Sequence, residues 1–183
     1  MPAPGIRVTA GSAKGLMLRI PSRPKTRPTS GRVREAIFSS IAHRTFSSVA
    51  DLFAGSGILG IEALSRGAAS VTFVESNRTA VSVIRANLEK SRFADRSLVI
   101  VRTVESMLRE AEPEFDLVLA DPPYDYADVD GLVTGVSDSL LRPEGILVFE
   151  HATRRGPPAA CPSLTLEKTR AHGDSAFSIF VKC

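Results

Sequence analysis

Short apolar runs alternate with amphipathic stretches along most of this 183-residue chain. The apolar runs lie at residues 49–53, 70–75, 98–101, 114–121 and 145–150. Residues 32–42, 58–66, 78–90, 104–110 and 128–141 instead carry apolar side chains at helical spacing. Strands that alternate with helices predict a parallel sheet covered on both faces, with ligands bound at the carboxyl ends of the strands.

Both ends of the chain depart from this alternation. Residues 6–10 and 16–20 are β-prone and flank a glycine-containing segment, which predicts a hairpin with Lys14 near its tip. A proline-punctuated basic loop follows at 21–31, where Thr29 or Ser30 can cap the next helix. Residues 164–168 and 176–182 predict a closing antiparallel pair. We therefore expect an α/β fold with a doubly wound, mostly parallel seven-stranded sheet at 31–183 and a small amino-terminal β-hairpin extension at 1–30.

Charge is distributed unevenly between these parts. Residues 1–45 contain nine Lys and Arg but one acid, a net charge of +8, whereas the remainder carries −5, which gives +3 for the whole chain. A basic arm on an acidic body is typical of a polyanion-binding appendage, because phosphate contacts supply most sequence-independent affinity for nucleic acid. A solvated basic terminus is the alternative interpretation.

Composition excludes several other classes of protein. The hydrophobic fraction of 43% and charged fraction of 23% are ordinary for a soluble domain, and no apolar run reaches membrane-spanning length. The first residues do not resemble a signal peptide, so we expect a cytoplasmic protein. Cys161 and Cys183 lack ligand spacing, and neither a metal site nor a disulfide framework is indicated.

A glycine-rich turn follows the run at 49–53. Gly55, Gly57 and Gly60 form the pattern G-x-G-x-x-G. The first two can adopt backbone angles closed to other residues and leave room for a ligand, and Gly60 lets the next helix lie close to the strand. Alone the pattern is weak, because dinucleotide-binding oxidoreductases share it.

Two carboxylates narrow the choice of cofactor. Glu75 comes twenty positions after Gly55, a spacing suited to binding a ribose diol. Asp51, beside the turn, would repel a pyrophosphate but could pair with a cationic amino acid moiety. S-adenosylmethionine carries such a moiety and NAD does not, so S-adenosylmethionine is the predicted cofactor. The alternative is a turn that only packs helix on strand, with both acids solvated.

The sequence Asp121-Pro122-Pro123-Tyr124 directly follows the run at 114–121. Prolines lack an N–H, so this turn presents carbonyl acceptors and a carboxylate, which suit an amino group. Asp121 and the Pro122 carbonyl could accept both hydrogens of an exocyclic base amine and direct its lone pair at a methyl group. Tyr124 offers a face for a base taken out of its stack. A tight turn with a packed tyrosine is the alternative, and His151, after the run at 145–150, could line the same cleft or be structural.

These motifs, with residues 7–15, 27–29 and 32–38, resemble the bacterial 16S rRNA guanine-N2 methyltransferase family. The resemblance covers nearly the whole chain. It implies the Rossmann-like fold of class I methyltransferases. It also implies an enzyme that transfers a methyl group from S-adenosylmethionine to the N2 amine of guanine 966 (conventional rRNA numbering), in 16S rRNA or the 30S subunit. The Asp-Pro-Pro-Tyr turn also occurs in adenine-N6 and protein-glutamine methyltransferases, so only the amino-terminal motifs favour guanine in rRNA.

The resemblance also implies roles for individual residues. The residues that would bind the cofactor are Asp51, Phe53, Gly55, Gly57, Glu75, Thr103 and Val104. Those that would hold the target amine and base are Asp121, Pro122 and Tyr124. Those that would contact rRNA are Arg7, Lys14, Arg27, Arg32 and Arg34. Thr29 and Glu35 would brace the cofactor loop. Many relatives have Asp or Asn in place of Thr103, so we expect the backbone around Val104 near the adenine. A monomer without metal is expected.

Two other functions remain open from the sequence. One is an adenine-N6 methyltransferase acting on DNA or RNA. The other is a non-catalytic RNA-binding assembly module with a vestigial cofactor fold.

Overall fold

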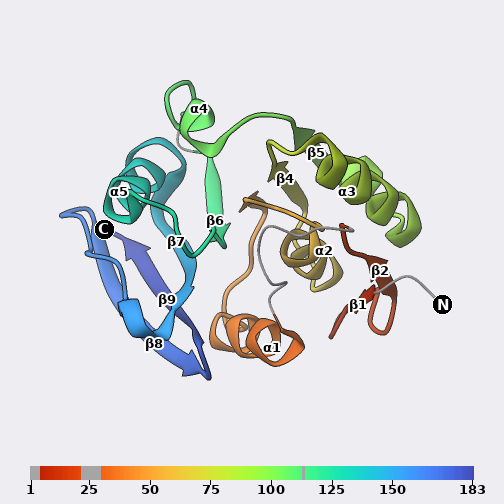
Figure 1. Ribbon diagram of the computed structural model, residues 1–183, viewed down its shortest axis with the longest axis horizontal. Coiled ribbons are helices and arrows are strands. Elements are labelled where there is room, and N and C mark those ends of the chain that lie inside the picture. Colours follow the sequence, from red (N-terminus) through yellow and green to blue (C-terminus); the bar gives the residue numbers. More distant parts are fainter. Residues whose placement is uncertain (1–4, 22–29, 113) are drawn as a thin grey trace.

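A seven-stranded sheet forms the centre of the computed structural model, which describes residues 5–21, 30–112 and 114–183 (Figure 1). Its strand order is β5-β4-β3-β6-β7-β9-β8. The strands are β3 (Ser48–Leu52), β4 (Ser70–Val74), β5 (Ser97–Ile100), β6 (Phe115–Ala120), β7 (Leu141–Ala152), β8 (Leu164–His172) and β9 (Ser175–Lys182). The first five are parallel, and β9 lies antiparallel between β7 and β8. The predicted fold class is thereby confirmed.

Helices cover both faces of this sheet. They are α1 (Gly31–Ser40), α2 (Ile58–Ser65), α3 (Arg78–Ser91), α4 (Val104–Leu108) and α5 (Val129–Ser139), with short 3₁₀ turns at Ala94–Arg96 and Thr153–Arg155. Apolar side chains of α1, α2 and α3 pack in one hydrophobic layer with Leu119 and Val148. Those of α4 and α5 pack in a second layer, with Val118 and Phe149 on the other face.

The chain changes direction across the sheet after β5. From β3 it proceeds through β4 to β5 at one edge, and then returns to place β6 on the other side of β3. Helices that diverge from two adjacent strands leave a crevice at the carboxyl ends of those strands. Asp51 of β3 and Asp121, directly after β6, lie at this switch point.

The amino-terminal hairpin lies against the body, beside α2 and α3 (Figure 1). Its strands β1 (Gly5–Arg7) and β2 (Met17–Arg19) are antiparallel and shorter than predicted. Val8 and Leu18 are buried in the layer that contains α2. The boundary at residue 30 remains a prediction, but this burial joins the hairpin to the core of the larger unit.

Several element ends differ from those predicted. β7 starts at Leu141 instead of residue 145, and β8 continues to His172 instead of 168. The additional residues of β8 are exposed and pair with β9, so backbone pairing maintains this strand where the apolar pattern is absent. In β7, Leu141 pairs with Phe115, and an irregularity in register separates this pair from the next one, Leu117 with Ile146. Ser30 caps α1, as its hydroxyl oxygen accepts a hydrogen bond from the Val33 N–H.

Within the described ranges, no helix is long and apolar enough to cross a membrane. The same ranges contain no group of three or more His, Cys, Asp or Glu side chains arranged to hold a metal ion.

Candidate active site at the carboxyl ends of the strands

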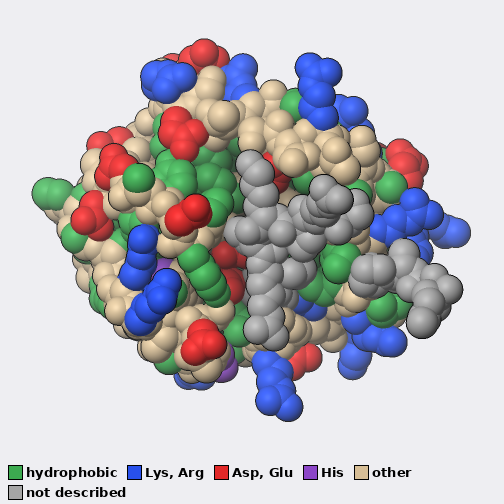
Figure 2. All heavy atoms as spheres, in the orientation of Figure 1, with side chains coloured by type: hydrophobic (Ala, Val, Ile, Leu, Met, Phe, Trp, Pro, Cys, Tyr) green, Lys and Arg blue, Asp and Glu red, His purple; other side chains and the backbone are tan. Residues whose placement is uncertain are grey.

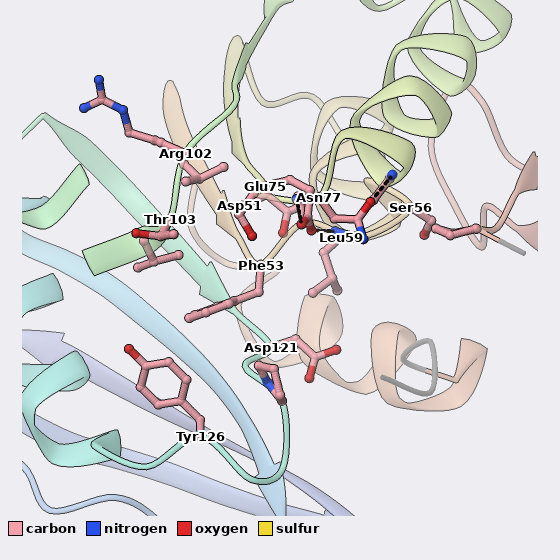
Figure 3. A pocket seen from close by; sticks show the side chains of 18 of the residues that line it. Asp51, Phe53, Ser56, Leu59, Glu75, Asn77, Arg102, Thr103, Asp121 and Tyr126 are labelled. Carbon is pink, nitrogen blue, oxygen red and sulfur yellow. Dashed lines mark hydrogen bonds between the residues drawn. The ribbon is translucent and has the colours of Figure 1, made fainter. Parts of the chain in front are cut away.

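A cavity of about 300 Å³ lies at the carboxyl ends of β3, β4 and β6 (Figure 3). We call it the first cavity. It brings together residues that the sequence places far apart, and its lining includes Asp51, Phe53, Gly55, Glu75, Thr103, Val104 and Asp121. Gly57 is the predicted cofactor residue that does not line it. The candidate cofactor residues and the candidate catalytic acid therefore share one space.

The three glycines of the turn have different roles. Gly55 and Gly57 adopt φ angles of 55° and 76°, a left-handed conformation that favours glycine, and Gly57 is the N-cap of α2. A Cβ added at Gly60 would lie 2.3 Å from Cε1 of Phe73 on β4. Gly60 therefore allows α2 to pack directly on the sheet, whereas Gly55 contributes to the wall of the cavity.

Asp51 is the buried acid of the site, with 1% of its surface exposed. Its Oδ2 accepts a hydrogen bond of 2.9 Å from the Gly60 N–H. Burial raises the pKa of Asp51 well above its usual range, and the charges of Asp121 and Glu75 raise it further against the lowering effect of the Gly60 hydrogen bond. A cation placed among these three acids would stabilise their charged forms. The site thus suits a ligand with a positive charge.

Glu75 is held in a fixed orientation at the end of β4. Its Oε2 accepts from the Gly55 N–H at 2.9 Å, and its Oε1 accepts from the Asn77 N–H at 2.8 Å. Each carboxylate oxygen can accept more than one hydrogen bond, so both remain available to a diol. Asn77 in turn caps α3 through Oδ1, which fixes the segment that carries both residues.

The opposite wall of the first cavity contains residues that the sequence analysis missed. The ring of Tyr126 meets Phe53 edge to face, with centroids 5.4 Å apart, and its hydroxyl donates to Glu105 Oε1 (Figure 3). Thr103 caps α4, since its hydroxyl oxygen accepts from the Ser106 N–H. The oxygen of this hydroxyl is therefore engaged in the helix cap. The expectation that the backbone near Val104 faces the adenine stays a prediction. The further missed lining residues include Ser56, Leu59, Asn77 and Arg102.

A second cavity of about 380 Å³ lies on the other side of the Asp-Pro-Pro-Tyr turn. Pro122 and Tyr124 line it, together with Glu150 and His151 from the end of β7. Tyr124 is 43% exposed, and its hydroxyl shares a hydrogen bond of 2.7 Å with Ser175 Oγ. Pro123 lines both cavities, so the turn lies between the first cavity and the second.

His151 is buried, and both of its ring nitrogens have polar neighbours. Nε2 lies 2.9 Å from Ser178 Oγ, and Nδ1 lies 3.2 Å from the Ala152 carbonyl oxygen. Burial lowers the pKa of His151. The ring is thus a buried, hydrogen-bonded part of the wall of the second cavity.

The predicted RNA-binding residues do not all reach the surface. Arg7, Lys14 and Arg32 are exposed. Figure 2 shows basic side chains over the region of the hairpin and α3. Arg27 lies outside the described residues, as does Thr29, and Glu35 is exposed on α1.

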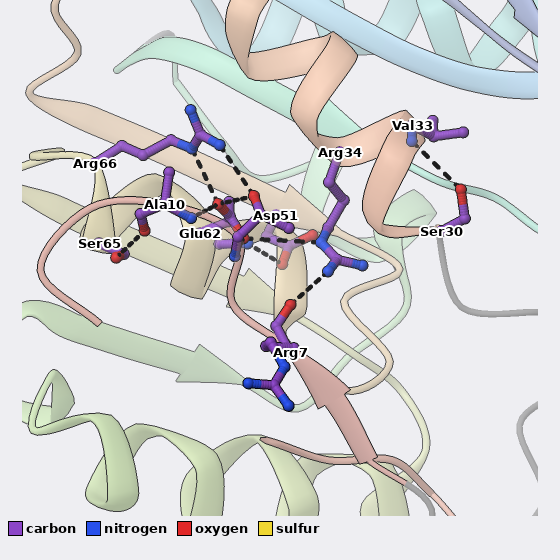
Figure 4. A network of polar contacts seen from close by, with 11 residues as sticks. Arg7, Ala10, Ser30, Val33, Arg34, Asp51, Glu62, Ser65 and Arg66 are labelled. Atoms are coloured by element: carbon purple, nitrogen blue, oxygen red, sulfur yellow. Dashed lines mark hydrogen bonds and ion pairs between the residues drawn. The ribbon is translucent and has the colours of Figure 1, made fainter. Parts of the chain in front are cut away.

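Arg34 is an exception, and the prediction that it contacts RNA is wrong. Its side chain lies among polar partners (Figure 4), and only 1% of its surface is exposed. Its guanidinium donates to the Arg7 carbonyl at 2.6 Å, and its Nε lies 3.8 Å from Glu62 Oε2. Burial lowers the pKa of Arg34, although the charge of Glu62 opposes this effect. The helical period places residue 34 on the same side of α1 as the buried Ile37 and Phe38, so its charge is used inside the protein.

The strand order and the switch point are those of the class I methyltransferase fold, which this chain adopts. The solved structure of the Escherichia coli protein yhhF has a TM-score of 0.88 and 27% identity, over 98% of this chain and 98% of that one. HI0767 of Haemophilus influenzae has a TM-score of 0.80 and 27% identity, over 98% and 99% of the two chains.

Sequence comparison identifies the family. The family described as Conserved hypothetical protein 95 matches residues 6–181, and the chain belongs to it. Ribosomal RNA small subunit methyltransferase D of Escherichia coli (strain K12) is 30% identical over 96% of this chain and 89% of the relative. YlbH of Bacillus subtilis (strain 168) is 32% identical over 97% and 99%. The expected resemblance to the bacterial small-subunit rRNA methyltransferases is confirmed.

Proposed function

We propose that this protein transfers a methyl group from S-adenosylmethionine to the N2 amine of a guanine in 16S rRNA, guanine 966 in conventional numbering. The observation that carries the proposal is the position of Asp121 and Pro122, between a cavity lined by Asp51 and Glu75 and a second cavity open to Tyr124. The name of the Escherichia coli relative supports small-subunit rRNA as the substrate. We infer a reaction in the cytoplasm, on 16S rRNA or on the 30S subunit. A single chain contains both cavities, which supports a monomeric enzyme.

The first cavity fits the cofactor on chemical grounds. S-adenosylmethionine, when bound, supplies a methyl group on a positively charged sulfur. Asp51 would pair with the ammonium group of its amino acid moiety, and Glu75 would accept from the ribose hydroxyls. The backbone near Val104 and the Phe53 ring would enclose the adenine.

The Asp-Pro-Pro-Tyr turn would prepare the amine for attack. Asp121 and the Pro122 carbonyl accept its two hydrogens, which directs the nitrogen lone pair away from the base ring and toward the methyl carbon. The cofactor would supply the methyl carbon as an electrophile, and its sulfur would keep the electron pair of the broken C–S bond as the new N–C bond forms. The proton lost from nitrogen passes to Asp121 or to water, because it becomes acidic only as the methyl group arrives. In-line positioning of amine, methyl and sulfur supplies much of the acceleration.

The exposed basic residues would hold the RNA. Arg7 and Lys14 on the hairpin and Arg32 on α1 are exposed, as contacts to phosphates require. Tyr124 would stack on the base after it leaves the helix.

The test is transfer of a labelled methyl group to small-subunit particles from cells that lack this protein, followed by nucleoside analysis. The expected product is N2-methylguanine at a single position. Asp121→Ala should reduce turnover at least about 100-fold, as expected for loss of an acceptor that acts in the transition state, and change cofactor affinity little. Asp125→Ala, an exposed acid four residues later, is the matched control and should remain active.

Other outcomes identify the alternatives. Detection of N6-methyladenine in the product would show that the target base is adenine and not guanine. Normal turnover by Asp121→Ala would refute the proposed role of the turn. An absence of both methyl transfer and cofactor binding would indicate a non-catalytic RNA-binding module.

A further inference from the structure

A second carboxylate lies next to the Asp-Pro-Pro-Tyr turn. β6 and β7 run parallel with Ala120 opposite Phe149, so Asp121 and Glu150 are the next residues along these two adjacent strands. Glu150 comes two positions after Val148, and Asp121 two positions after Leu119; both of these apolar residues face the layer under α1 and α2. Because side chains alternate along strands, the two acids are directed to the same face of the sheet.

Glu150 is also part of the second cavity. It lines this space together with Pro122 and Tyr124, although only 4% of its surface is exposed. A buried carboxylate is costly unless charge or hydrogen bonds stabilise it. Arg34 supplies such a charge, and the electrostatic effect is mutual, since Glu150 raises the pKa of the Arg34 guanidinium against the lowering effect of burial.

Two neighbouring carboxylates match one nucleobase edge. Guanine presents N1–H and the N2 amine side by side, so two adjacent acceptors can bind two adjacent donors. Adenine presents its N6 amine beside N1, which is an acceptor. A carboxylate opposite this nitrogen would repel its lone pair, and unpaired polar groups in a closed site cause strong discrimination.

We propose that Glu150 accepts the N1–H of the target guanine while Asp121 and Pro122 hold the N2 amine, so that Glu150 selects guanine over adenine. This proposal rests on the proposed function and assigns its base specificity to a residue outside the Asp-Pro-Pro-Tyr motif. Glu150 is a specificity-determining residue here, because it contacts the base without taking part in methyl transfer. The competing interpretation is that it serves only as a counter-charge for Arg34.

The test uses an analogue that changes N1 and keeps the reacting amine. In 2,6-diaminopurine the amine on C2 is retained, but N1 is an acceptor. Small-subunit particles would be assembled from ligated rRNA carrying either guanine or 2,6-diaminopurine at the target position. Wild-type protein should strongly prefer guanine. In Glu150→Gln the side-chain amide can donate to N1, so the ratio of guanine to diaminopurine turnover should fall about 10- to 100-fold, the range expected for a hydrogen bond to a charged group.

Two further variants separate specificity from structure. Asp130→Asn removes an exposed acid that lines the same cavity and should leave the ratio unchanged. Glu150→Asp keeps the charge on a shorter side chain and should preserve the preference for guanine at a lower rate. Because the readout is a ratio within each variant, partial loss of folded protein cancels.

The outcomes distinguish this proposal from the proposed function. If wild-type protein forms no N2-methylguanine, the proposed function itself fails. If it methylates guanine but uses 2,6-diaminopurine equally well, the Glu150 assignment is overturned. The assignment is also overturned if Glu150→Gln lowers both rates by the same factor, which is the result expected of a counter-charge for Arg34.

Discussion

The carboxylate of Glu62 connects three parts of the protein that are distant in sequence (Figure 4). It is completely buried on α2. Its Oε2 accepts from the Thr9 N–H at 2.9 Å, and its Oε1 accepts from the Ala10 N–H and from Arg66 Nε, each at 3.0 Å. Arg34 of α1 lies 3.8 Å away. We predict that Glu62→Gln destabilises the whole protein and loosens the hairpin.

The magnitude follows from burial. Glutamine has the same size, but it removes the negative charge opposite the buried Arg34 and replaces one acceptor oxygen with a donor. Removal of one partner from a buried ion pair costs about 3–5 kcal/mol. For a domain of this length each kcal/mol lowers the Tm by about 2–4 °C, so the midpoint should fall by about 6–20 °C.

Urea unfolding followed by circular dichroism measures this loss directly. Glu89→Gln, an exposed acid on α3, is the matched control and should change stability by less than about 0.5 kcal/mol. Limited proteolysis should also cut the hairpin of Glu62→Gln earlier than that of the wild type. If the free energy of unfolding of Glu62→Gln lies within about 1 kcal/mol of the wild-type value, the reasoning is refuted. Burial of Val8 and Leu18 would then hold the hairpin without the carboxylate.

Two other predictions concern Asp51 and Gly11. The pKa of Asp51 is raised in the folded protein, so above the ordinary carboxyl pKa the folded protein binds more protons than the unfolded chain. The free energy of unfolding without cofactor should therefore fall as the pH rises, by at most about 1.4 kcal/mol per pH unit. Asp51→Asn should remove this slope, stabilise the unligated protein at neutral pH and weaken S-adenosylmethionine binding about 10- to 100-fold; equal pH slopes in melting experiments would contradict it. A Cβ at Gly11 would lie 1.8 Å from the Ser65 carbonyl oxygen, and φ of Gly11 is 79°. Gly11→Ala should therefore lower the free energy of unfolding by about 1–3 kcal/mol, as measured by urea unfolding. Gly15 has φ of 86° but open space around it, so Gly15→Ala should cause a smaller loss.

The sequence was sufficient to predict the sheet and the motifs at its edge. Buried parallel strands have near-continuous apolar runs, so β3, β4 and β6 were recognised close to their observed ends. Asp51 and Glu75 were found because parallel topology brings strand ends together, whatever their distance in the chain. Local chemistry also predicted the packing role of Gly60.

Other features depend on contacts that no local pattern contains. Arg34 was assigned to RNA by the family resemblance, as one of the cations of the basic amino-terminal segment; its counter-charge, Glu62, lies on another helix, where no local pattern reveals it. Tyr126 was missed because its role depends on Phe53 and Glu105, which come from other elements. Pairing with β9 supports the carboxyl-terminal half of β8, whose exposed residues give no apolar period.

The hairpin and the glycine turn are tied together by Asn87 of α3. Its buried carboxamide accepts from the Arg19 N–H at 2.8 Å and donates to the carbonyl oxygens of Arg19 and Ser56, each at 2.9 Å. Ser56 belongs to the turn that lines the first cavity, and Pro21, two residues after Arg19, lines that cavity as well. Methyl transfer requires two substrates in line, so positional error between their binding elements slows the reaction. Asn87 of α3 and Glu62 of α2 would limit this error, because they hold the hairpin, which is proposed to contact RNA, and the glycine turn, which is proposed to face the cofactor, against these two helices.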